Sequence, residues 1–403
     1  MSSTMFAPTV LFLLVVVASC YSKSDEQNLA KANNEFCVSL LKQLTSEKTH
    51  DNVFFSPTSI STALAMIYAG AGGLSKKELS KVLGQARFGL TDRNTVIAAY
   101  KKLLAGTNSG NVTLDIANFV LIENRLPVLD SFKKTLTESF GAELRSVNFA
   151  NDGPRVQSQV NEWVRQKTGG KILSMVDDGF PMNTAMLLLN AVYFNATWHD
   201  QFPEKNTVPR SFFNRGSEEV HVKTMAFKGP IRHTSLDGLK AQAVELPYQG
   251  EEYSMVIVLP NAKMGLSQLR EGLTVSMLQK ITNQMSAKTV SLTLPKFELQ
   301  TNYDLIPTLK QMGLKSVFDE KSDFSGITGD KSLSVSGVRH KAMVEVNEKG
   351  TVAAAVTSIS MRMGSSLASR IVNFHVDRPF LFYIRNRATG RLLFMGEVHQ
   401  LQA

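Results

Sequence analysis

The chain has 403 residues, of which 43% are hydrophobic and 20% are charged. This composition is typical of a globular protein with a large core and excludes an intrinsically disordered chain. Lys and Arg outnumber Asp and Glu by 44 to 35, but no block of five like charges occurs, so charge alone predicts no nucleic-acid-binding function.

The N-terminus has the pattern of a secretory signal. Residues 10–17 form an apolar run too short to span a bilayer, and the small residues 18–20 precede Tyr21. We therefore predict a signal peptide at 1–20 and a secreted, extracellular mature protein. No Lys or Arg precedes the apolar run, which leaves a non-cleaved anchor as the alternative. No later segment reaches the length of a membrane span, so no membrane partner is expected.

Cleavage at this place would remove Cys20 and leave Cys37 as the one thiol. Stability would then rest on a large core rather than on disulfides. Cys37 lies in a helix-like apolar pattern, which favours a buried small hydrophobic residue over a reactive thiol.

Hydrophobic periodicity predicts helices in the first half of the mature chain and strands after it. Helices are expected at 27–46, 58–70, 76–83 and 92–105, the second of them starting at Ser56-Pro57. Strands are expected at 114–122, 186–193, 241–246, 253–259 and 290–295, followed by a hairpin with strands at 381–384 and 392–396. No Pro/Ser-rich linker or repeat divides the chain, so 21–403 is predicted to be a single α+β domain.

Two Asn-x-Thr sequons, at Asn111 and Asn195, predict N-glycosylation. Asn111 follows a turn-like segment, whereas Asn195 lies within an apolar strand-like run. No Gly-x-Ser-x-Gly, phosphate-binding Gly-x-x-x-x-Gly-Lys or His-Glu-x-x-His motif occurs, and the seven His residues lack metal-ligand spacing. We therefore predict neither an enzyme nor a metal site.

The segment 350–362 is a run of small, β-compatible residues that follows Glu348 and Lys349. It is too poor in large apolar side chains to form a core strand by itself. A strand can enter the middle of a sheet only if its side chains pass the neighbouring strands without clash or buried charge, and every residue from 351 to 361 meets this requirement. The segment is therefore predicted to be either exposed or inserted between other strands.

Two polar residues lie beside apolar strand-like runs, Asn190 before 191–194 and His340 before 341–346. Each fits the ordinary role of a satisfied polar group in a core. Each also has donors and acceptors that could exchange partners when a sheet opens.

Several motifs together resemble the signatures of the serpin family and occur in serpin order. They are 55–60, 161–164, 168–172, 189–194 with Trp198, 340–342, 344–351 and 374–382. The resemblance covers essentially the whole mature chain and is greatest to arthropod serpins, particularly tick salivary ones. It implies an α+β serpin fold with three β-sheets, about nine helices and an exposed reactive-centre loop at about 350–373.

Serpins offer this loop as bait to a serine protease and insert the cut loop into the central sheet, which traps the acyl-enzyme. The resemblance thus implies a protease inhibitor, with a non-inhibitory carrier or binding protein as the alternative. The hinge residues it implies are Glu348, Gly350, Thr351, Ala353, Ala354 and Ala355, with Gly350 supplying a flexible start. The resemblance also implies two regions where strands of the sheet separate. One is the shutter, formed by Ser56, Ser59, Asn190 and His340. The other is the breach, where the loop first enters the sheet, and it contains Trp198. Val352 departs from the Glu that is commoner at its position.

The residues leave the position of the reactive bond open. Roughly seventeen residues counted from Glu348, about 54 Å of extended chain, place it at Gly364-Ser365, which suits an elastase-like pocket. Side-chain chemistry instead favours Arg362-Met363 for trypsin-like enzymes, or Met363-Gly364 for chymotrypsin-like, cathepsin G-like or elastase-like ones. We rank the count first.

The expected partners are serine proteases, including host haemostatic or inflammatory ones, and the expected state is a monomer. Some serpins bind glycosaminoglycans on the helix that matches 92–105. Because Arg93, Lys101 and Lys102 are sparse there, we expect no cofactor, with a glycosaminoglycan as the weaker alternative.

Overall fold

The computed structural model describes residues 7–46, 50–105, 112–351 and 371–402, with side chains from Ser24 onward. Ten α-helices lie in these ranges: α1 (Ala7–Leu44), α2 (Pro57–Gly70), α3 (Gly73–Val82), α4 (Arg93–Ala105), α5 (Asp130–Phe140), α6 (Phe149–Lys167), α7 (Leu266–Glu271), α8 (Val275–Gln284), α9 (Ile306–Gln311) and α10 (Ser325–Thr328).

The strands of the described residues form two hydrogen-bonded sheets. The six-stranded sheet has the order β10 (Phe297–Asp304), β11 (Gly337–Val346), β12 (Gly350–Thr351), β4 (Met186–Thr197), β2 (Val112–Glu123) and β3 (Glu143–Val147). The nine-stranded sheet has the order β1 (Val53–Phe55), β15 (Leu392–Val398), β14 (Phe380–Asn386), β8 (Tyr253–Pro260), β7 (Ala241–Pro247), β6 (Glu218–Leu236), β9 (Ser286–Pro295) and β13 (Val372–His375), with β5 (Val208–Asn214) paired to β6.

The α+β class is confirmed, and each predicted helix and strand overlaps an element of the same type. The number of sheets differs, since three are expected and the described strands form two. The reason is β6, a strand of 19 residues that pairs with β7 through 232–236 and with β9 through 224–233. Two smaller sheets are therefore continuous through one long strand.

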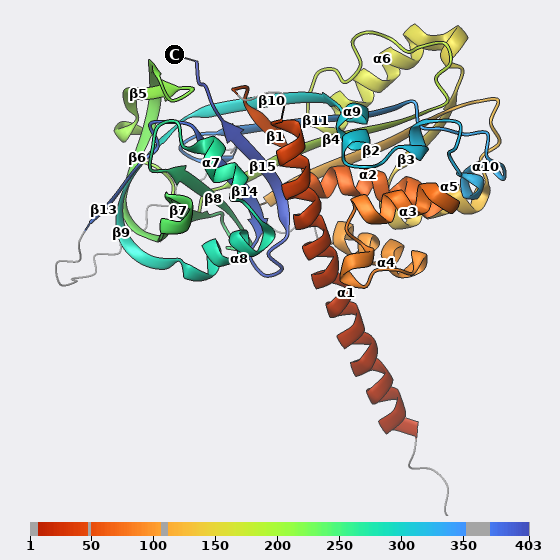
Figure 1. Cartoon of the computed structure of the whole chain (residues 1–403), viewed down its shortest axis with the longest axis horizontal. Coiled ribbons are helices and arrows are strands. Elements are labelled where there is room, and N and C mark those ends of the chain that lie inside the picture. The colour runs from red at the N-terminus through yellow and green to blue at the C-terminus, as the bar shows by residue number, and fades with distance from the viewer. Residues whose placement is uncertain (1–6, 47–49, 106–111, 352–370, 403) are drawn as a thin grey trace, which may run out of the picture.

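Helices cover both faces of the six-stranded sheet. Figure 1 shows α2–α5 on one side of it and α6 on the other. The helix α2 is buried at 13 of its 14 positions, and it starts where the sequence predicts. Ser56 is its N-cap, with the side-chain oxygen accepting the backbone N–H of Ser59, and Pro57 is its first residue. This start places two serine side chains directly beneath the sheet.

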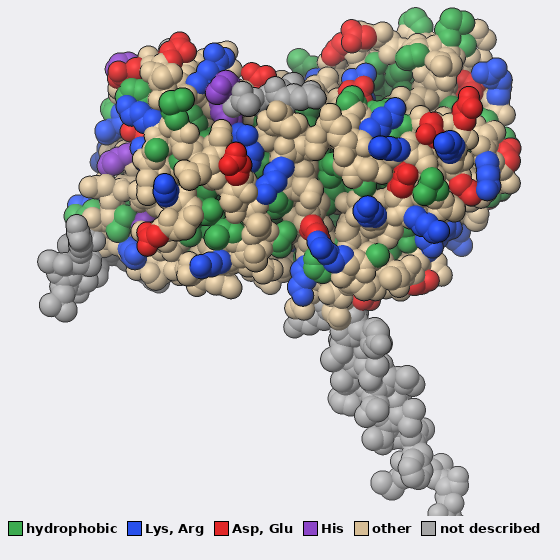
Figure 2. Space-filling model, in the orientation of Figure 1, with side chains coloured by type: hydrophobic (Ala, Val, Ile, Leu, Met, Phe, Trp, Pro, Cys, Tyr) green, Lys and Arg blue, Asp and Glu red, His purple; other side chains and the backbone are tan. Residues whose placement is uncertain are grey.

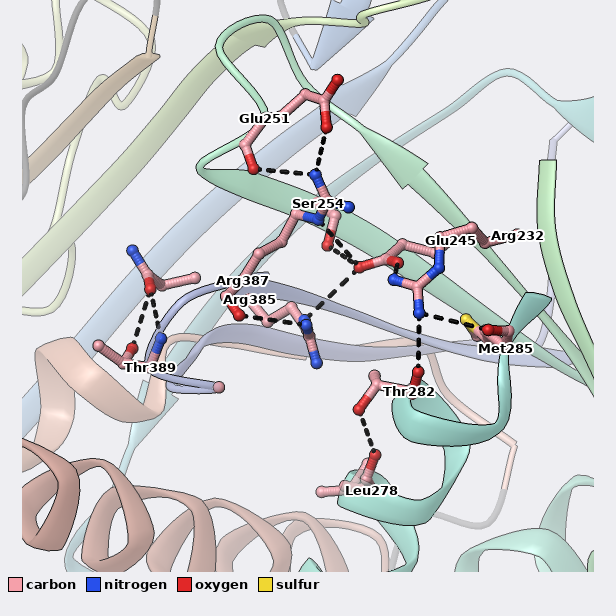
Figure 3. Close-up of polar contacts among 12 residues, drawn as sticks. Arg232, Glu245, Glu251, Ser254, Leu278, Thr282, Met285, Arg385, Arg387 and Thr389 are labelled. Atoms are coloured by element: carbon pink, nitrogen blue, oxygen red, sulfur yellow. Dashed lines mark hydrogen bonds and ion pairs between the residues drawn. The ribbon is translucent and has the colours of Figure 1, made fainter. Parts of the chain in front are cut away.

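A buried carboxylate joins several strands of the nine-stranded sheet. Figure 3 shows Glu245 of β7 surrounded by Arg232 of β6 and by Arg385 and Arg387 at the end of β14. The carboxylate accepts a hydrogen bond from Arg232 and another from the Ser254 hydroxyl at 2.8 Å. Arg385 and Arg387 lie 3.7 and 3.5 Å from it. Because Glu245 is 1% exposed, its charge needs these cations to remain in the core.

Candidate functional site

The first two residues of the expected insertion segment already form a strand. Gly350 and Thr351 constitute β12, which lies between the ends of β11 and β4. It pairs antiparallel with both, Thr351 facing Val346 of β11 and Ala196 of β4. Farther along, β11 pairs directly and in parallel with β4 over residues 337–343. Between β11 and β4, the position of an additional strand is therefore taken by β12 at one end, while farther along the two strands pair with each other directly.

Gly350 is required by the close approach of two backbones. A Cβ at this position would lie 2.1 Å from the carbonyl oxygen of Ala196 and 2.7 Å from the Cα of Thr197. Both distances are far inside van der Waals contact, so a side chain here would displace β12 or β4. The structure thus adds a steric reason for glycine to the conformational one expected from the sequence.

Aromatic residues hold β12 in place. Thr351 is fully buried, and its hydroxyl lies 2.7 Å from the Tyr248 hydroxyl. The Tyr248 ring stacks on Trp198 with ring centroids 4.6 Å apart. The Trp198 indole N–H donates to the Asn347 carbonyl at 2.9 Å, and its backbone N–H donates to the Lys349 carbonyl at 2.9 Å. The predicted breach residue therefore binds the turn that leads into β12.

Glu348 anchors the chain just before β12. Its carboxylate accepts a hydrogen bond from the Thr207 hydroxyl at 2.8 Å and pairs with the Lys296 ammonium at 2.9 Å. Partial burial raises the pKa of this carboxyl, but the hydrogen bonds it accepts, chiefly from Lys296, outweigh burial and leave the pKa lowered. An ionised Glu348 thus fixes the start of the hinge to the connection between β9 and β10.

The four predicted shutter residues meet in one buried network. Asn190 of β4 and His340 of β11 face each other in the sheet register, and the His340 Nδ1–H donates to Asn190 Oδ1. The Asn190 amide also donates to the Ser59 hydroxyl. On the other side of the imidazole, Nε2 accepts the backbone N–H of Ser56 at 3.2 Å. Each of the four residues is at most 1% exposed.

His340 is held in the neutral form. Burial lowers the pKa of the imidazole from 6.5 to about 3. One ring nitrogen accepts the N–H of Ser56, which leaves the proton on the nitrogen that faces Asn190. The direct bond between β11 and β4 at this point is therefore a neutral hydrogen bond.

Asn118 completes the network, and the sequence motifs do not point to it. It lies on β2 opposite Asn190, and its Oδ1 accepts a hydrogen bond from the Asn190 amide at 2.7 Å. It is 4% exposed. The available signal was a polar residue inside the apolar run 114–122, which is the same kind of signal that identifies Asn190.

The helix α6 and the loop after it cover the opposite face of the sheet where β11 and β4 meet. Side chains of α6 pack in one cluster with residues from both strands: Val160, Trp163, Val164, Leu189, Ala191 and Met343. The Lys341 ammonium of β11 donates to the Ser174 carbonyl in that loop at 2.7 Å. Burial lowers the pKa of this ammonium, against the opposing effect of Asp177. A strand that enters between β11 and β4 must therefore pass beneath a packed cover.

Comparisons with known proteins agree with this arrangement of strands. The family model described as "Serpin (serine protease inhibitor)" matches residues 31–401. The chain belongs to the serpin family.

Known serpins resemble the chain over nearly its whole length. It is 41% identical over 396 residues to Iripin-2 of Ixodes ricinus, covering 98% of each chain, which confirms the likeness to tick serpins. Among solved structures, human thyroxine-binding globulin complexed with thyroxine has a TM-score of 0.86 and 27% identity, covering 94% of this chain and 100% of that one. Serpin48 of the insect Tenebrio molitor has a TM-score of 0.83 and 31% identity, covering 93% of this chain and 99% of that one. This serpin is thus a member of a family of protease inhibitors rather than an enzyme.

The segment expected to be the reactive-centre loop, about 350–373, includes strand residues at both of its described ends. Gly350 and Thr351 belong to β12, and Val372 begins β13, which pairs in parallel with β9. The expectation of an exposed segment is therefore wrong at its first end, because Thr351 is buried between two strands. The rest of the expected site lies outside the described residues: Ala353, Ala354, Ala355, Arg362, Met363, Gly364, Ser365 and the sequon Asn111.

The remaining predicted positions lie in ordinary surroundings. Asn195 is partly exposed on β4, and its glycosylation stays a prediction. Cys37 is fully buried, and burial raises the pKa of its thiol. In α4, Arg93 donates to the Ala71 carbonyl and Lys102 lies 3.4 Å from Glu26, so two of its three basic residues are engaged within the protein.

No group of three or more His, Cys, Asp or Glu side chains in the described part of the chain could hold a metal ion. No described helix is both long and apolar enough to cross a membrane.

Proposed function

We propose that this serpin inhibits serine proteases as a suicide substrate, by inserting its cut reactive loop between β11 and β4. The observation that carries the proposal is β12. Two residues of the expected insertion segment already occupy the position of a new strand, antiparallel to both neighbours. Insertion would extend an existing strand rather than nucleate a new one.

The register of β12 supports the proposal. If an inserted loop kept this register along both neighbours, Thr357 would lie opposite Asn190 on β4 and His340 on β11. With the two-residue period of a strand, Thr357 would face the same side as Thr351. Its hydroxyl could then accept a hydrogen bond from the His340 imidazole and donate one to Asn190, two side chains that now bond to each other directly. No residue from 352 to 361 is charged or Pro, so none would bring a buried charge or interrupt the ladder.

The experiment is incubation with trypsin, chymotrypsin and elastase, followed by a denaturing gel. Inhibition by insertion predicts an SDS-stable complex and a released C-terminal peptide. Mass spectrometry of that peptide locates the bond. We propose that the cleaved bond is Gly364-Ser365, which predicts a new N-terminus at Ser365. A new N-terminus at Met363 would instead indicate cleavage of Arg362-Met363, and one at Gly364 would indicate cleavage of Met363-Gly364. Cleavage of the loop without any complex would reject the mechanism.

We also propose that the inhibitor is a secreted monomer that acts on host haemostatic or inflammatory proteases and needs no cofactor. The signal at 1–20 supports secretion. Cleavage before Tyr21 would remove the first part of α1 and keep its packed part, because its buried side chains begin at Leu29 among those described. N-terminal sequencing of secreted protein tests the cleavage site, and glycosidase treatment tests Asn111 and Asn195. Inhibition rates with and without heparin test the cofactor.

The alternative is a carrier. It is favoured by the likeness to thyroxine-binding globulin, a protein solved with a bound hormone. The lack of charge and Pro in 352–361 argues against it, because a carrier has no need of an insertable segment. A stable protease complex would exclude a purely carrier function, while clean cleavage together with ligand binding would favour it.

A further inference from the structure

His233 places a titratable side chain in the core beside β13. Its imidazole lies on β6, is 2% exposed, and contacts the ring of Phe374 on β13 edge to face, with ring centroids 6.3 Å apart. Figure 2 shows that other His side chains, in purple, reach the surface on the half of the molecule that carries β5, β6 and β13. Protonation of His233, unlike theirs, takes place inside the protein.

The two ring nitrogens of His233 have different surroundings. Nε2 lies 3.2 Å from the side-chain oxygen of Gln242 on β7, and because an amide oxygen only accepts, the ring proton lies on Nε2. Nδ1 is buried and has no hydrogen-bond partner within the described part of the chain. A second proton, on Nδ1, would therefore be a buried donor and a buried charge without an acceptor.

The charged groups of the neighbouring elements do not supply that acceptor. On β9, Lys288 lies near enough to His233 for its positive charge to oppose protonation. On β6 and β7, Arg232 and Glu245 pair with each other, and the alternation of side chains puts them on the other face of the sheet. On β13, His375 is exposed. An imidazolium at this place would thus have a cation nearby, while the carboxylate closest in the register is engaged with arginine.

The surroundings of His233 therefore disfavour its charged form. Burial lowers the pKa of the imidazole, the hydrogen bond with Gln242 opposes this shift, and Lys288 adds to it. The folded protein keeps the imidazole neutral at pH values where an exposed one, with the ordinary pKa of 6.5, takes up a proton. As the pH falls through 6.5, linkage favours any state in which His233 is open to water.

The strand that covers His233 has few other attachments. β13 is four residues long and, among the described strands, pairs with β9 alone. Phe374 is its buried side chain, and it packs in the same cluster as Val290 and Leu292 of β9. β13 is also the first strand that the structure describes after β12, so it anchors the chain on the far side of the expected reactive bond.

We propose that His233 is a pH-sensitive anchor of β13, in which the neutral imidazole lets Phe374 remain in the core and protonation releases β13 from β9. When Phe374 leaves its position against the imidazole, water reaches Nδ1 and solvates the added proton. The anchorage of the chain beyond the expected reactive bond then weakens in an acidic medium. This device goes beyond protease inhibition and can be tested without a protease.

The test is hydrogen–deuterium exchange of the β13 amides, read by mass spectrometry at pH 7.5 and pH 5. The measured quantity is the exchange rate of the unsubstituted protein divided by that of His233→Phe at the same pH, so the intrinsic effect of pH on exchange cancels. His233→Phe keeps a ring beside Phe374 and cannot take up a proton. Between pH 7.5 and pH 5 the ratio should rise about tenfold. The limit is about thirtyfold, because at pH 5 an imidazole with the ordinary pKa of 6.5 is protonated about thirty times as often as it is neutral.

Two controls locate the effect. In β14, which pairs with β8 and β15, the same ratio should change by less than about twofold, because β13 alone is released. His221→Phe removes an exposed imidazole from β6, and exchange of β13 in this variant should follow that of the unsubstituted protein at both pH values. The titration of His340 is common to all these proteins and cancels in the ratio.

The proposal is overturned if the β13 ratio is the same at both pH values, or if it rises equally in β14, which would indicate a general loss of stability. If His233→Phe does not fold, His233→Gln replaces it as the variant that cannot titrate. If neither folds, exchange of β13 relative to β14 within the unsubstituted protein decides, and an equal value at both pH values overturns the proposal. Complex formation with a protease is not part of this measurement, so failure here is distinct from a failure of the proposed inhibition.

Discussion

The substitution Gly350→Ala tests whether β12 controls loop insertion. The added Cβ would lie 2.1 Å from the Ala196 carbonyl oxygen, so either the sheet shifts or β12 leaves it. Overpacking of a tight site costs about 1–3 kcal/mol. Expulsion of β12 would instead lose the hydrogen bond between Thr351 and Tyr248, worth about 1 kcal/mol, and the burial of the threonine. The two routes have similar costs, so we expect the native protein to lose about 1–3 kcal/mol of stability.

The same clash persists after cleavage, because an inserted loop would keep the register of β12. Insertion should therefore slow, and a larger share of encounters should end in cleavage without a stable complex. The assay is the ratio of complex to cleaved serpin on a denaturing gel at equal protease, together with a thermal melt. Gly238→Ala is the matched control, because a Cβ there meets nothing within 4 Å. If Gly350→Ala keeps both the melting temperature and the complex yield of the unsubstituted protein, the reasoning about β12 is wrong.

Three further predictions concern buried polar groups. Asn190→Ala removes the side chain that accepts the His340 Nδ1–H and donates to the Ser59 hydroxyl, so it should lower stability by about 3 kcal/mol and promote polymers, measured by thermal melt and native gel. Unchanged monomer content and melting would reject the shutter assignment. The folded-state pKa of His340, about 3, lies below its ordinary value of 6.5, so between pH 3 and pH 6.5 the unfolded chain binds a proton that the folded protein does not. The free energy of unfolding should therefore fall as the pH falls through this range, by about 2 kcal/mol at pH 5. In His340→Asn, the free energy of unfolding measured with urea should depend less on pH over the same range. Glu245→Gln should lower the free energy of unfolding in urea by about 3 kcal/mol, because Arg232 and its neighbours lose their buried counter-charge. The control Glu251→Gln, at an exposed position, should lower it by less than about 1 kcal/mol. Equal losses would contradict the role of Glu245 as the buried counter-charge.

The sequence predicts what the insertion segment can do but not where it is. Small uncharged residues show that a strand could enter a sheet, and this follows from side-chain size and charge alone. The burial of Thr351 depends on Tyr248 and Trp198, whose positions along the chain are far from the hinge and are brought to it by the fold. No local pattern around Thr351 contains that information.

The shutter shows a similar limit. Asn190 and His340 are found because they interrupt apolar runs and match a family motif. Asn118 interrupts an apolar run as well, but its importance comes from the register that sets β2 against β4. Two asparagines become partners only when the pairing of the strands is known, and sequence periodicity gives the face of a residue rather than its neighbour on the next strand.

The position of β12 also locates the barrier to insertion. The direct parallel pairing of β11 with β4 begins at Met343 and Tyr193, only a short way beyond β12, and the entering strand would replace each of those main-chain bonds with bonds of its own. The side-chain bond between His340 and Asn190 is different, because it must break before Thr357, about 20 Å of strand beyond Thr351, can replace it. For that interval buried donors and acceptors lack partners, which is the costliest state along the path. The shutter, rather than the breach, should therefore set the rate of insertion.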